Sequence, residues 1–380
     1  MKILFASDSF KGSLTSQRIS ELLTIATKKV FPKAETISMN VADGGEGTMS
    51  AVVETLHGTW KTINVLNPIG KTITAKYGIL PDNKAIIEMA EASGLALISK
   101  NEQNAAKTTS IGTGMLIKDA LDAGIRDITI AIGGSATNDG GMGMLEALGV
   151  RFFDDKRNLL HGFGENLLKI ADINLENLHL AINETKFTVM CDVVNPLLGE
   201  QGATFTFGKQ KGANKDTLNY LEQGMTHYAK LVNNILHADF TNVAGSGAAG
   251  GLGFALMSFV SAKTQSGIDA VLDLLNFDEK LTDVDLVITG EGRMDWQSVY
   301  GKVPSGIGKR CMQAQVPAVA IVGGLLSNYE KIYDCGIESV VTTINNAMTV
   351  EEAIANSERL YLDAAIRLLR MIKCGISMAK

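Results

Sequence analysis

The sequence predicts an α/β protein with two domains. Its 380 residues are about two to three times the typical length of one domain. Short β-branched runs recur between segments of helical periodicity, which is typical of parallel strands joined by helices. One stretch in the first third of the chain shows a hairpin pattern instead. We therefore predict a Rossmann-like parallel-sheet domain interrupted by an inserted mixed α+β domain.

The predicted strands are runs in which β-branched and apolar residues cluster. Each run is four to six residues long, which suits a buried strand and is too short for a helix. Helical patterns lie between several of them, so most are expected to pair in parallel. The runs cover residues 2–6, 36–41, 127–132, 187–191, 286–289, 318–322 and 339–343.

Two helices carry clear boundary signals. Apolar residues recur with helical spacing over residues 19–30, behind a Thr-Ser N-cap signal, and Pro32 stops the pattern. A second helix is predicted to start at Thr349, which forms a capping box with Glu352. We expect it to run to about Met371 and to cover the end of the fold.

The domain boundary follows from a change of pattern between residues 60 and 89. Alternating strands there are interrupted at residues 67–70 and 81–83 by turn sequences, which is a hairpin signal. We expect ligands in the cleft between the two domains, where such sites often form. The predicted first domain combines residues 1–58 and 282–380, and the inserted domain covers residues 59–281.

Composition excludes several functional classes. The chain carries 35 Lys and Arg against 41 Asp and Glu, a net charge of −6, which is the opposite of a nucleic-acid-binding surface. The four cysteines form no C-x-x-C pair, and no histidine lies at zinc-ligand spacing. No apolar run approaches the roughly 20 residues of a membrane span. We expect a reduced, cytoplasmic protein with small-molecule substrates and leave open whether it forms a homodimer.

Glycine is in excess, and the surplus gathers beside acidic residues that follow predicted strands. The 39 glycines make up about 10% of the chain, against a usual share of roughly 7%. Ligands bind at the carboxyl ends of parallel strands, and glycine there lets the backbone approach a bulky anion. The acidic loops are Asp8, Asp43-Gly44-Gly45-Glu46-Gly47, Asn138-Asp139-Gly140-Gly141, Cys191-Asp192 and Gly290-Glu291-Gly292-Arg293-Met294-Asp295.

Each loop taken alone could be a tight turn in which Asp or Asn bonds its own backbone. Five of them together favour a site for a hard divalent cation, Mg²⁺ above all, held by one or two carboxylates and by phosphate oxygens. Phosphoryl transfer is then the leading reaction class, and it requires cationic side chains near the phosphates. The candidates are Lys11, Lys209, Lys211, Arg293 and Lys302.

Motif searches narrow the choice. The chain has no G-x-x-x-x-G-K-[ST] sequence, so it is not predicted to be a P-loop kinase, and it has no G-x-S-x-G nucleophile elbow. Residues 245–250 match G-x-G-x-x-G, but the preceding residues 240–244 make a poor strand. Three interpretations remain for this segment: dinucleotide binding, close backbone packing, or a loop that contacts phosphate.

Taken in order, these motifs resemble the bacterial type I glycerate kinases, and the resemblance extends to about residue 310. The sequence departs from the family pattern at two positions, because Ser7 and Lys209 stand where the family usually has proline. The last 70 residues add little to the resemblance. The matching segments are Ser7 to Leu14, Ala42 to Thr48, Gly133 to Gly141, Cys191 to Val193, Asn195 to Leu197, Phe207 to Ala213, Gly247 to Gly253, Thr289 to Asp295 and Gly301 to Pro304.

The resemblance implies ATP-dependent phosphorylation of D-glycerate with Mg²⁺, giving 2-phosphoglycerate or 3-phosphoglycerate and ADP. It also implies two α/β-type domains unlike those of P-loop kinases. Two other classes would share the acidic loops or the cleft: a metal-dependent phosphatase or hydrolase of a small phosphorylated acid, and a non-catalytic sensor of small acids.

The same resemblance suggests roles for individual residues. Asp43 or Asp192 accepts the proton of the attacking hydroxyl. Lys11 neutralises charge on the transferring phosphoryl group, and Arg293 is the best-shaped partner for the glycerate carboxylate. The expected Mg²⁺ ligands are Glu46, Glu291 and Asp295. The expected contacts of ATP are Ser9, Gly44, Gly45, Gly47, Gly134, Ser135, Asn138, Lys211 and Gly250.

Overall fold

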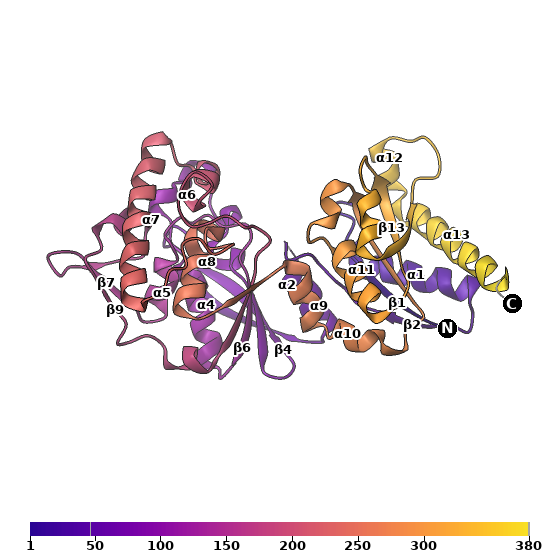
Figure 1. Cartoon of the computed structure of the whole chain (residues 1–380), viewed down its shortest axis with the longest axis horizontal. Coiled ribbons are helices and arrows are strands. Elements are labelled where there is room, and N and C mark those ends of the chain that lie inside the picture. Colours follow the sequence, from indigo (N-terminus) through magenta and orange to yellow (C-terminus); the bar gives the residue numbers. More distant parts are fainter. Residues whose placement is uncertain (46, 379–380) are drawn as a thin grey trace. The chain divides into compact units, whose positions relative to one another are not determined.

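A computed structural model describes residues 1–45 and 47–378 of the chain (Figure 1). It is an α/β structure with parallel sheets, and it divides into two compact units that we describe separately. We call them the terminal unit (Met1–Asp43, Ser50–Leu56 and Gly267–Lys380) and the central unit (Gly44–Met49 and His57–Ser266). No helix in the described part of the chain has both the length and the apolar composition needed to cross a membrane.

The terminal unit is built on five parallel strands in the order β14-β13-β12-β1-β2. Numbered along the unit, this order is 2-1-3-4-5, the arrangement of a doubly wound sheet. The order reverses between β1 and β12, so a crevice is expected at their carboxyl ends. All five strands overlap runs predicted from sequence: β1 (Lys2–Ser7), β2 (Glu35–Ser38), β12 (Leu286–Met294), β13 (Ala318–Leu325) and β14 (Ile337–Thr342).

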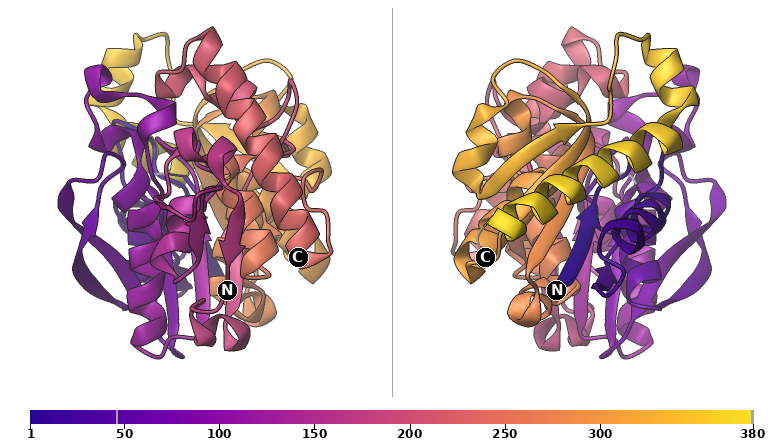
Figure 2. Two further views of the ribbon diagram at one scale, coloured as in Figure 1. Left: turned by 90° about the vertical axis from the view of Figure 1, so that its left-hand side faces the viewer. Right: turned by 90° about the vertical axis from the view of Figure 1, so that its right-hand side faces the viewer.

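One face of this sheet is covered by α1 (Ser16–Val30) and α13 (Ser357–Met378), which pack together in the right-hand view of Figure 2. Their apolar stripes meet the sheet in one core, which includes Ile19, Leu23 and Tyr361. The remaining helices of the unit are most of α2 (Thr48–Thr55), α9 (Gly267–Leu274), α10 (Phe277–Lys280), α11 (Val303–Ala314) and α12 (Val350–Ala355).

The C-terminal helix predicted over residues 349–371 is two helices. The predicted capping box is present, because Thr349 Oγ1 accepts from Glu352 N at 3.2 Å and Thr349 N donates to Glu352 Oε2 at 2.8 Å. However, α12 ends after six residues, and Asn356 separates it from α13. Because helical spacing of apolar residues continues through the break, the sequence pattern alone did not reveal it.

The predicted return to the first domain at residue 282 comes too late. Residues 267–280 form α9 and α10, and they belong to the terminal unit. Here Gly306 of α11 lets Ile268 approach so closely that a Cβ at Gly306 would lie 2.4 Å from Ile268 Cγ1. Arg310 of α11 also pairs with Asp273 of α9 at 2.7 Å. These long-range contacts, which have no local sequence signal, set the boundary.

The central unit contains a six-stranded mixed sheet in the order β11-β10-β6-β5-β4-β3. The hairpin predicted over residues 60–89 is present, since β3, β4 and β5 pair antiparallel before β5 joins β6 in parallel. A separate small sheet has the order β8-β7-β9. The strands are β3 (Thr59–Leu66), β4 (Thr72–Leu80), β5 (Lys84–Glu88), β6 (Asp127–Ala131), β7 (Arg151–Phe153), β8 (Leu159–Leu160), β9 (Asp172–Asn174), β10 (Lys186–Met190) and β11 (Lys263–Gln265).

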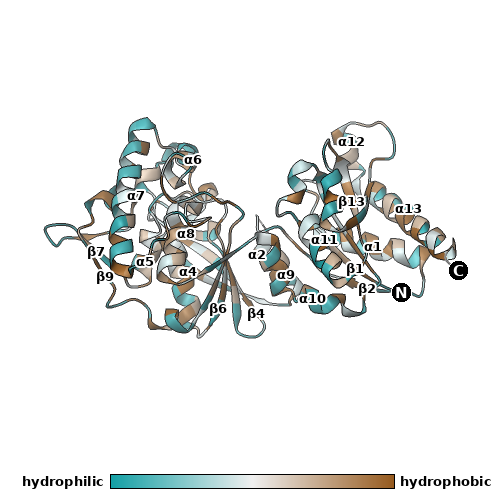
Figure 3. Ribbon diagram, viewed as in Figure 1, coloured by the Kyte–Doolittle hydropathy of each residue, from teal (hydrophilic) through white to brown (hydrophobic). Residues whose placement is uncertain are grey.

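The helices of the central unit differ in hydropathy (Figure 3). The longest, α7, alternates hydrophilic and hydrophobic residues and starts at Asn214, whose side chain accepts from Thr217 N. By contrast, α8 is almost wholly buried. The helices are α3 (Ala90–Ser93), α4 (Ile111–Asp122), α5 (Met142–Ala147), α6 (Ala203–Phe207), α7 (Lys215–Leu236) and α8 (Ala248–Phe259).

Candidate functional site

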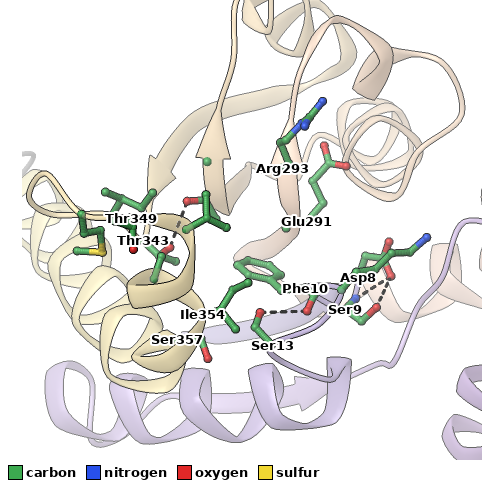
Figure 4. Close-up of a pocket in the computed structure, with 18 of the residues that line it drawn as sticks. Asp8, Ser9, Phe10, Ser13, Glu291, Arg293, Thr343, Thr349, Ile354 and Ser357 are labelled. Atoms are coloured by element: carbon green, nitrogen blue, oxygen red, sulfur yellow. Dashed lines mark hydrogen bonds between the residues drawn. The ribbon is translucent and has the colours of Figure 1, made fainter.

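The terminal unit contains a pocket of about 500 Å³ near the carboxyl ends of β1, β12, β13 and β14 (Figure 4). It therefore lies where the strand order of the sheet reverses, as expected for a doubly wound sheet. Charged side chains gather on one part of its wall and apolar side chains on another. The charged residues are Asp8, Lys11, Asp43, Glu291, Arg293 and Lys302.

Glu291 is the most buried of the pocket's charged residues, with 5% of its surface exposed. Its Oε2 lies 3.5 Å from Lys302 Nζ, whereas Oε1 is buried and has no hydrogen-bond partner among the described residues. Burial raises the pKa of this carboxyl to about 7, against the opposing effects of Ser298 and Lys302. Such an orphaned oxygen fits a position for an external donor or cation.

Asp8 is the second carboxyl whose pKa is raised. Burial and then the negative charge of Asp43 raise it to about 6, although Ser9 N donates to Asp8 Oδ1 at 2.7 Å and opposes the shift. The Glu291 pKa is raised in turn by the charge of Asp8. The three carboxyls thus interact electrostatically within one pocket, and a bound cation would relieve their repulsion.

These carboxylates fit Mg²⁺ on chemical grounds. Magnesium usually takes only one or two carboxylates and completes its shell with water and phosphate oxygens. Within residues 1–45 and 47–378, no group of three or more His, Cys, Asp or Glu side chains is placed to hold a metal ion. Glu46, the first predicted ligand, lies outside the described residues, so only Glu291 of the predicted set lines the pocket.

Asp295, the third predicted metal ligand, does not line the pocket and has a local structural role. Its Oδ1 accepts from Gln297 N at 2.9 Å, and its backbone N donates to Ser298 Oγ at 3.0 Å, which caps a short 3₁₀ turn. Its Oδ2 lies 3.4 Å from Arg293 Nη2. Because both carboxylate oxygens already have protein partners, we do not include Asp295 among the proposed Mg²⁺ ligands.

Lys11 is held at the tip of a tight turn directly after β1. The turn is closed by two backbone bonds, from Phe10 N to Leu14 O at 2.8 Å and from Leu14 N to Phe10 O at 3.0 Å. Gly12 has φ of +79°, which suits glycine at this position. The Phe10 ring packs edge-on against Tyr361 with centroids 5.5 Å apart, so the turn is anchored to the core and the Lys11 side chain remains exposed.

The central unit gathers a second group of predicted residues around a buried lysine. Lys211 is 1% exposed, and its Nζ donates to Ser135 Oγ at 2.7 Å and to Thr137 O at 2.6 Å. Burial lowers its pKa to about 7, an effect that the charge of Asp139 partly opposes. The sequence predicts that Lys211 contacts ATP; in the structure, the two contacts of its ammonium lie within the loop that follows β6.

The loop after β6 is fixed mainly by Asp139. This buried carboxylate accepts from Ser110 N at 2.7 Å, Ser110 Oγ at 2.8 Å, Gly141 N at 3.1 Å and Gly143 N at 3.2 Å. Gly133 and Gly134, by contrast, are exposed, and a Cβ at Gly133 would meet no atom within 4 Å. The loop therefore combines a buried, hydrogen-bonded segment at Asp139 with an exposed glycine pair.

Gly250 and Asn138 are packed inside the central unit. A Cβ at Gly250 would lie 2.0 Å from Thr137 O, and Gly250 O accepts from Gly140 N at 3.0 Å. Asn138 is fully buried, and its Nδ2 donates to Thr204 Oγ1 at 3.3 Å. Of the three interpretations of residues 245–250, close backbone packing is the one that these contacts favour.

The other predicted residues of the central unit lie in exposed or half-buried loops. Gly44 and Gly47 have φ of +91° and +88°, respectively, and Gly45 O accepts from Thr48 N at 3.2 Å. Asp192 is exposed and follows the carboxyl end of β10. These residues belong to the central unit, whereas Ser9, Lys11, Asp43, Glu291 and Arg293 line the pocket of the terminal unit.

One wall of the pocket was not predicted from the sequence. Residues of the loop after β14 and of α12 line it, although the C-terminal 70 residues had carried no functional motif. The capping box at Thr349 was the only available signal, and it indicates a helix without indicating what the helix faces. The apolar members of this wall are Ile344, Met348, Val350, Ala353 and Ile354.

We expect Lys211 to make the stability of the protein depend on pH. Because the folded-state pKa is about 7 and the ordinary pKa of lysine is 10.5, the unfolded chain binds more protons between these values. The contribution of Lys211 to unfolding free energy therefore rises with pH in this window, by roughly 1.4 kcal/mol per unit at most. In urea titrations at about pH 7 and pH 9, wild type should gain roughly 2 kcal/mol relative to Lys211→Met. Exposed Lys209→Met is the control, and parallel pH curves for wild type and Lys211→Met would contradict the expectation.

Comparison with known proteins agrees with this architecture. The model of the glycerate kinase family matches residues 3–373. "Glycerate kinase" of Halalkalibacterium halodurans is 41% identical over 96% of both chains, and "Glycerate 2-kinase" of Escherichia coli K12 is 41% identical over 93% of both. A crystal structure from Salmonella typhimurium LT2, for which glycerate kinase 2 is the proposed assignment, has a TM-score of 0.91, 40% identity and 99% coverage of both chains. The chain therefore belongs to the glycerate kinase family.

Proposed function

We propose that this chain is an ATP-dependent glycerate kinase that transfers the γ-phosphoryl group of ATP to a hydroxyl of D-glycerate. The products are ADP and 2-phosphoglycerate or 3-phosphoglycerate. Family membership supports the reaction class, and the relatives named above support the acceptor. The observation that carries the proposal is the pocket at the strand-order reversal, in which carboxylates and cations stand together.

Phosphoryl transfer is catalysed mainly by positioning and electrostatic stabilisation, so the pocket needs both signs of charge. In our proposal Lys11 neutralises the transferring phosphoryl group, for which its exposed position on an anchored turn is suitable. Arg293 can hold the glycerate carboxylate with two parallel hydrogen bonds. Its side chain is 68% exposed and lies 3.4 Å from Asp295, which steadies the guanidinium.

We assign the role of general base to Asp43 in preference to Asp192. Asp43 shares the pocket with Lys11 and Glu291, and its charge is felt by Asp8. A carboxylate in this position can accept the proton of the glycerate hydroxyl as the phosphorus–oxygen bond forms. The hydroxyl oxygen then carries the phosphoryl group, and ADP leaves with the electron pair of the broken bond.

Glu291 and Asp8 are the residues that we propose to hold Mg²⁺, with Glu46 as a further predicted ligand. The orphaned Oε1 of Glu291 and the raised pKa of both carboxyls fit a site that binds a cation. When bound, the ion neutralises charge on the phosphate oxygens of ATP.

For the central unit we propose a supporting role toward ATP. Gly134 is exposed, and glycine backbone can approach phosphate oxygens closely, whereas Ser135 directly after it is buried with 8% of its surface exposed. Gly44, Gly45 and Gly47 offer similar backbone freedom. In the terminal unit, Ser9 offers a hydroxyl group to ATP. Lys211 is better placed to position Ser135 than to touch phosphate, because both of its contacts lie in the loop.

The proposal is tested by following ADP release in a coupled assay with Mg-ATP. We expect ADP formation that depends on D-glycerate and is much slower with L-lactate, which lacks a second hydroxyl. Phosphorus NMR of the product identifies the hydroxyl that reacts. Release of inorganic phosphate from a phosphoglycerate without ATP would favour the phosphatase alternative. Glycerate binding with no ADP formation would favour the sensor alternative.

Lys11→Ala should lower kcat by about 10²- to 10³-fold with little loss of stability, because it removes one aimed positive charge from the transferring group. Lys29→Ala, which removes an exposed lysine from α1, is the control and should retain full activity. Steady-state kinetics and thermal melts measure both effects. A Lys11→Ala enzyme that turns over at the wild-type rate would remove Lys11 from the mechanism.

A further inference from the structure

The pocket of the terminal unit has a second, apolar part whose chemistry differs from that of its charged part. Three helix positions, Val350, Ala353 and Ile354, line it together with Ile344 from the loop after β14. In Figure 4, Ile354 lies on the same side of the pocket as Thr343 and Thr349, while Glu291, Arg293 and Asp8 lie on the other side. One pocket therefore offers both charge and apolar surface.

Glycerate cannot use the apolar part. It has three carbons, each bearing oxygen, so it presents almost no apolar surface to bury. A nucleotide has both chemistries, because its phosphates need cations and its base is a flat, largely apolar ring. Resting on the proposed function, we infer that the apolar wall of residues 344–354 seats the adenine ring of ATP, with the phosphates toward the charged end.

The local structure of α12 supports this assignment. Residues 350, 353 and 354 have the i, i+3, i+4 spacing that places side chains on one face of a helix, and all three line the pocket. The helix is separated from α13 at Asn356, and its first turn is closed by the capping box at Thr349. A short independent helix is thus held with its apolar face toward the pocket.

The exposure of these side chains is consistent with a ligand that covers them. Ile344 is 40% exposed, Val350 70% and Ile354 44%. Phe10, which is 6% exposed, lies at the same pocket and directly precedes Lys11. The turn that presents Lys11 to the phosphates would therefore also contribute to the floor under the nucleoside. Ser13 and Thr343 also line the pocket; their hydroxyls donate to Phe10 O and Gly323 O, so each oxygen can still accept a hydrogen bond from the base or ribose.

The test is Ile354→Glu, an exposed position where glutamate is compatible with a helix. We expect the Kd of Mg-ADP, measured by calorimetry without glycerate, to rise at least about tenfold. The Kd of Mg-tripolyphosphate, which has no base, should stay within about twofold of wild type. In turnover assays the KM of ATP should rise while kcat and the KM of glycerate change little. Met371→Glu, an exposed apolar residue of α13 outside the pocket, is the matched control and should behave as wild type.

Two further outcomes separate this inference from the proposed function. If glycerate is not phosphorylated but Ile354→Glu still weakens Mg-ADP selectively, the nucleotide subsite stands and the assigned reaction fails. If glycerate phosphorylation is normal and Ile354→Glu leaves the Kd of Mg-ADP unchanged, the subsite is wrong. An equal loss of affinity for Mg-ADP and tripolyphosphate would also overturn it, because the wall would then act on phosphate. Photolabelling with 8-azido-ADP should mark residues 344–357 in wild type.

Discussion

Asp43→Asn should lower kcat by about 10²- to 10⁴-fold, the usual range for loss of a general base. The amide keeps the shape of the side chain but cannot accept the hydroxyl proton of glycerate as phosphoryl transfer proceeds. Since Asp43 is half-buried and not part of the apolar core, the fold should be retained. Stopped assays over hours are needed to measure the residual rate, and circular dichroism melts verify folding.

Asp192→Asn is the matched comparison, because Asp192 is the other aspartate considered for this role. It is exposed and follows β10 in the central unit, whereas Asp43 lines the pocket of the terminal unit. We expect Asp192→Asn to retain activity within about tenfold of wild type. The reverse pattern, with near-normal Asp43→Asn and inactive Asp192→Asn, would transfer the proposed base to Asp192.

Gly250→Ala should destabilise the folded protein by roughly 2 to 4 kcal/mol. Gly250 has φ of +67°, a conformation unfavourable for alanine, and the added Cβ would lie 2.0 Å from Thr137 O. The methyl group can be accommodated only if the loop after β6 moves away from its support. Urea unfolding followed by circular dichroism measures the change.

Gly124→Ala is the control that measures the backbone strain without a steric clash. Gly124 also has positive φ, +85°, but a Cβ there would meet nothing within 4 Å. We therefore expect Gly124→Ala to cost only the backbone strain, about 1 kcal/mol. If Gly250→Ala instead keeps wild-type stability and loses affinity for Mg-ATP, then Gly250 contacts the nucleotide as first predicted, and close packing is not its main role.

Local sequence patterns were sufficient to predict the strands of the terminal sheet. The runs at 2–6, 286–289 and 318–322 each overlap a strand, because a buried parallel strand needs little beyond consecutive β-branched and apolar residues. The hairpin over residues 60–89 could also be predicted from the sequence, since its turns contain Pro, Asn and Gly. The order of the strands in the sheet could not be predicted from the sequence, because β1 lies beside β12, which follows it by more than 280 residues.

The candidate site was only partly predictable for a related reason. Asp43 and Glu291 were expected in loops after two parallel strands, and both line one pocket, because carboxyl ends of parallel strands converge. Glu291, however, lies within β12, which extends to Met294. Burial of a charged group was not predictable. Lys211 lies in a glycine-rich stretch typical of surface loops, yet it is 1% exposed, and only the tertiary packing of residues 135–139 around it explains this.

The pairing of β1 with β12 has a consequence for synthesis on the ribosome. Ile3 stands opposite Leu286 in the sheet, so β1, which has β2 as an early partner on one edge, obtains its partner on the other edge only 283 residues later. At about 5 to 20 residues per second this delay lasts roughly 15 to 60 s. The central unit consists mainly of one continuous stretch, His57–Ser266, and can fold during that interval. The edge of β1 that faces β12 therefore lacks its partner strand until late in translation, and an unpaired strand edge of this kind is open to wrong pairing.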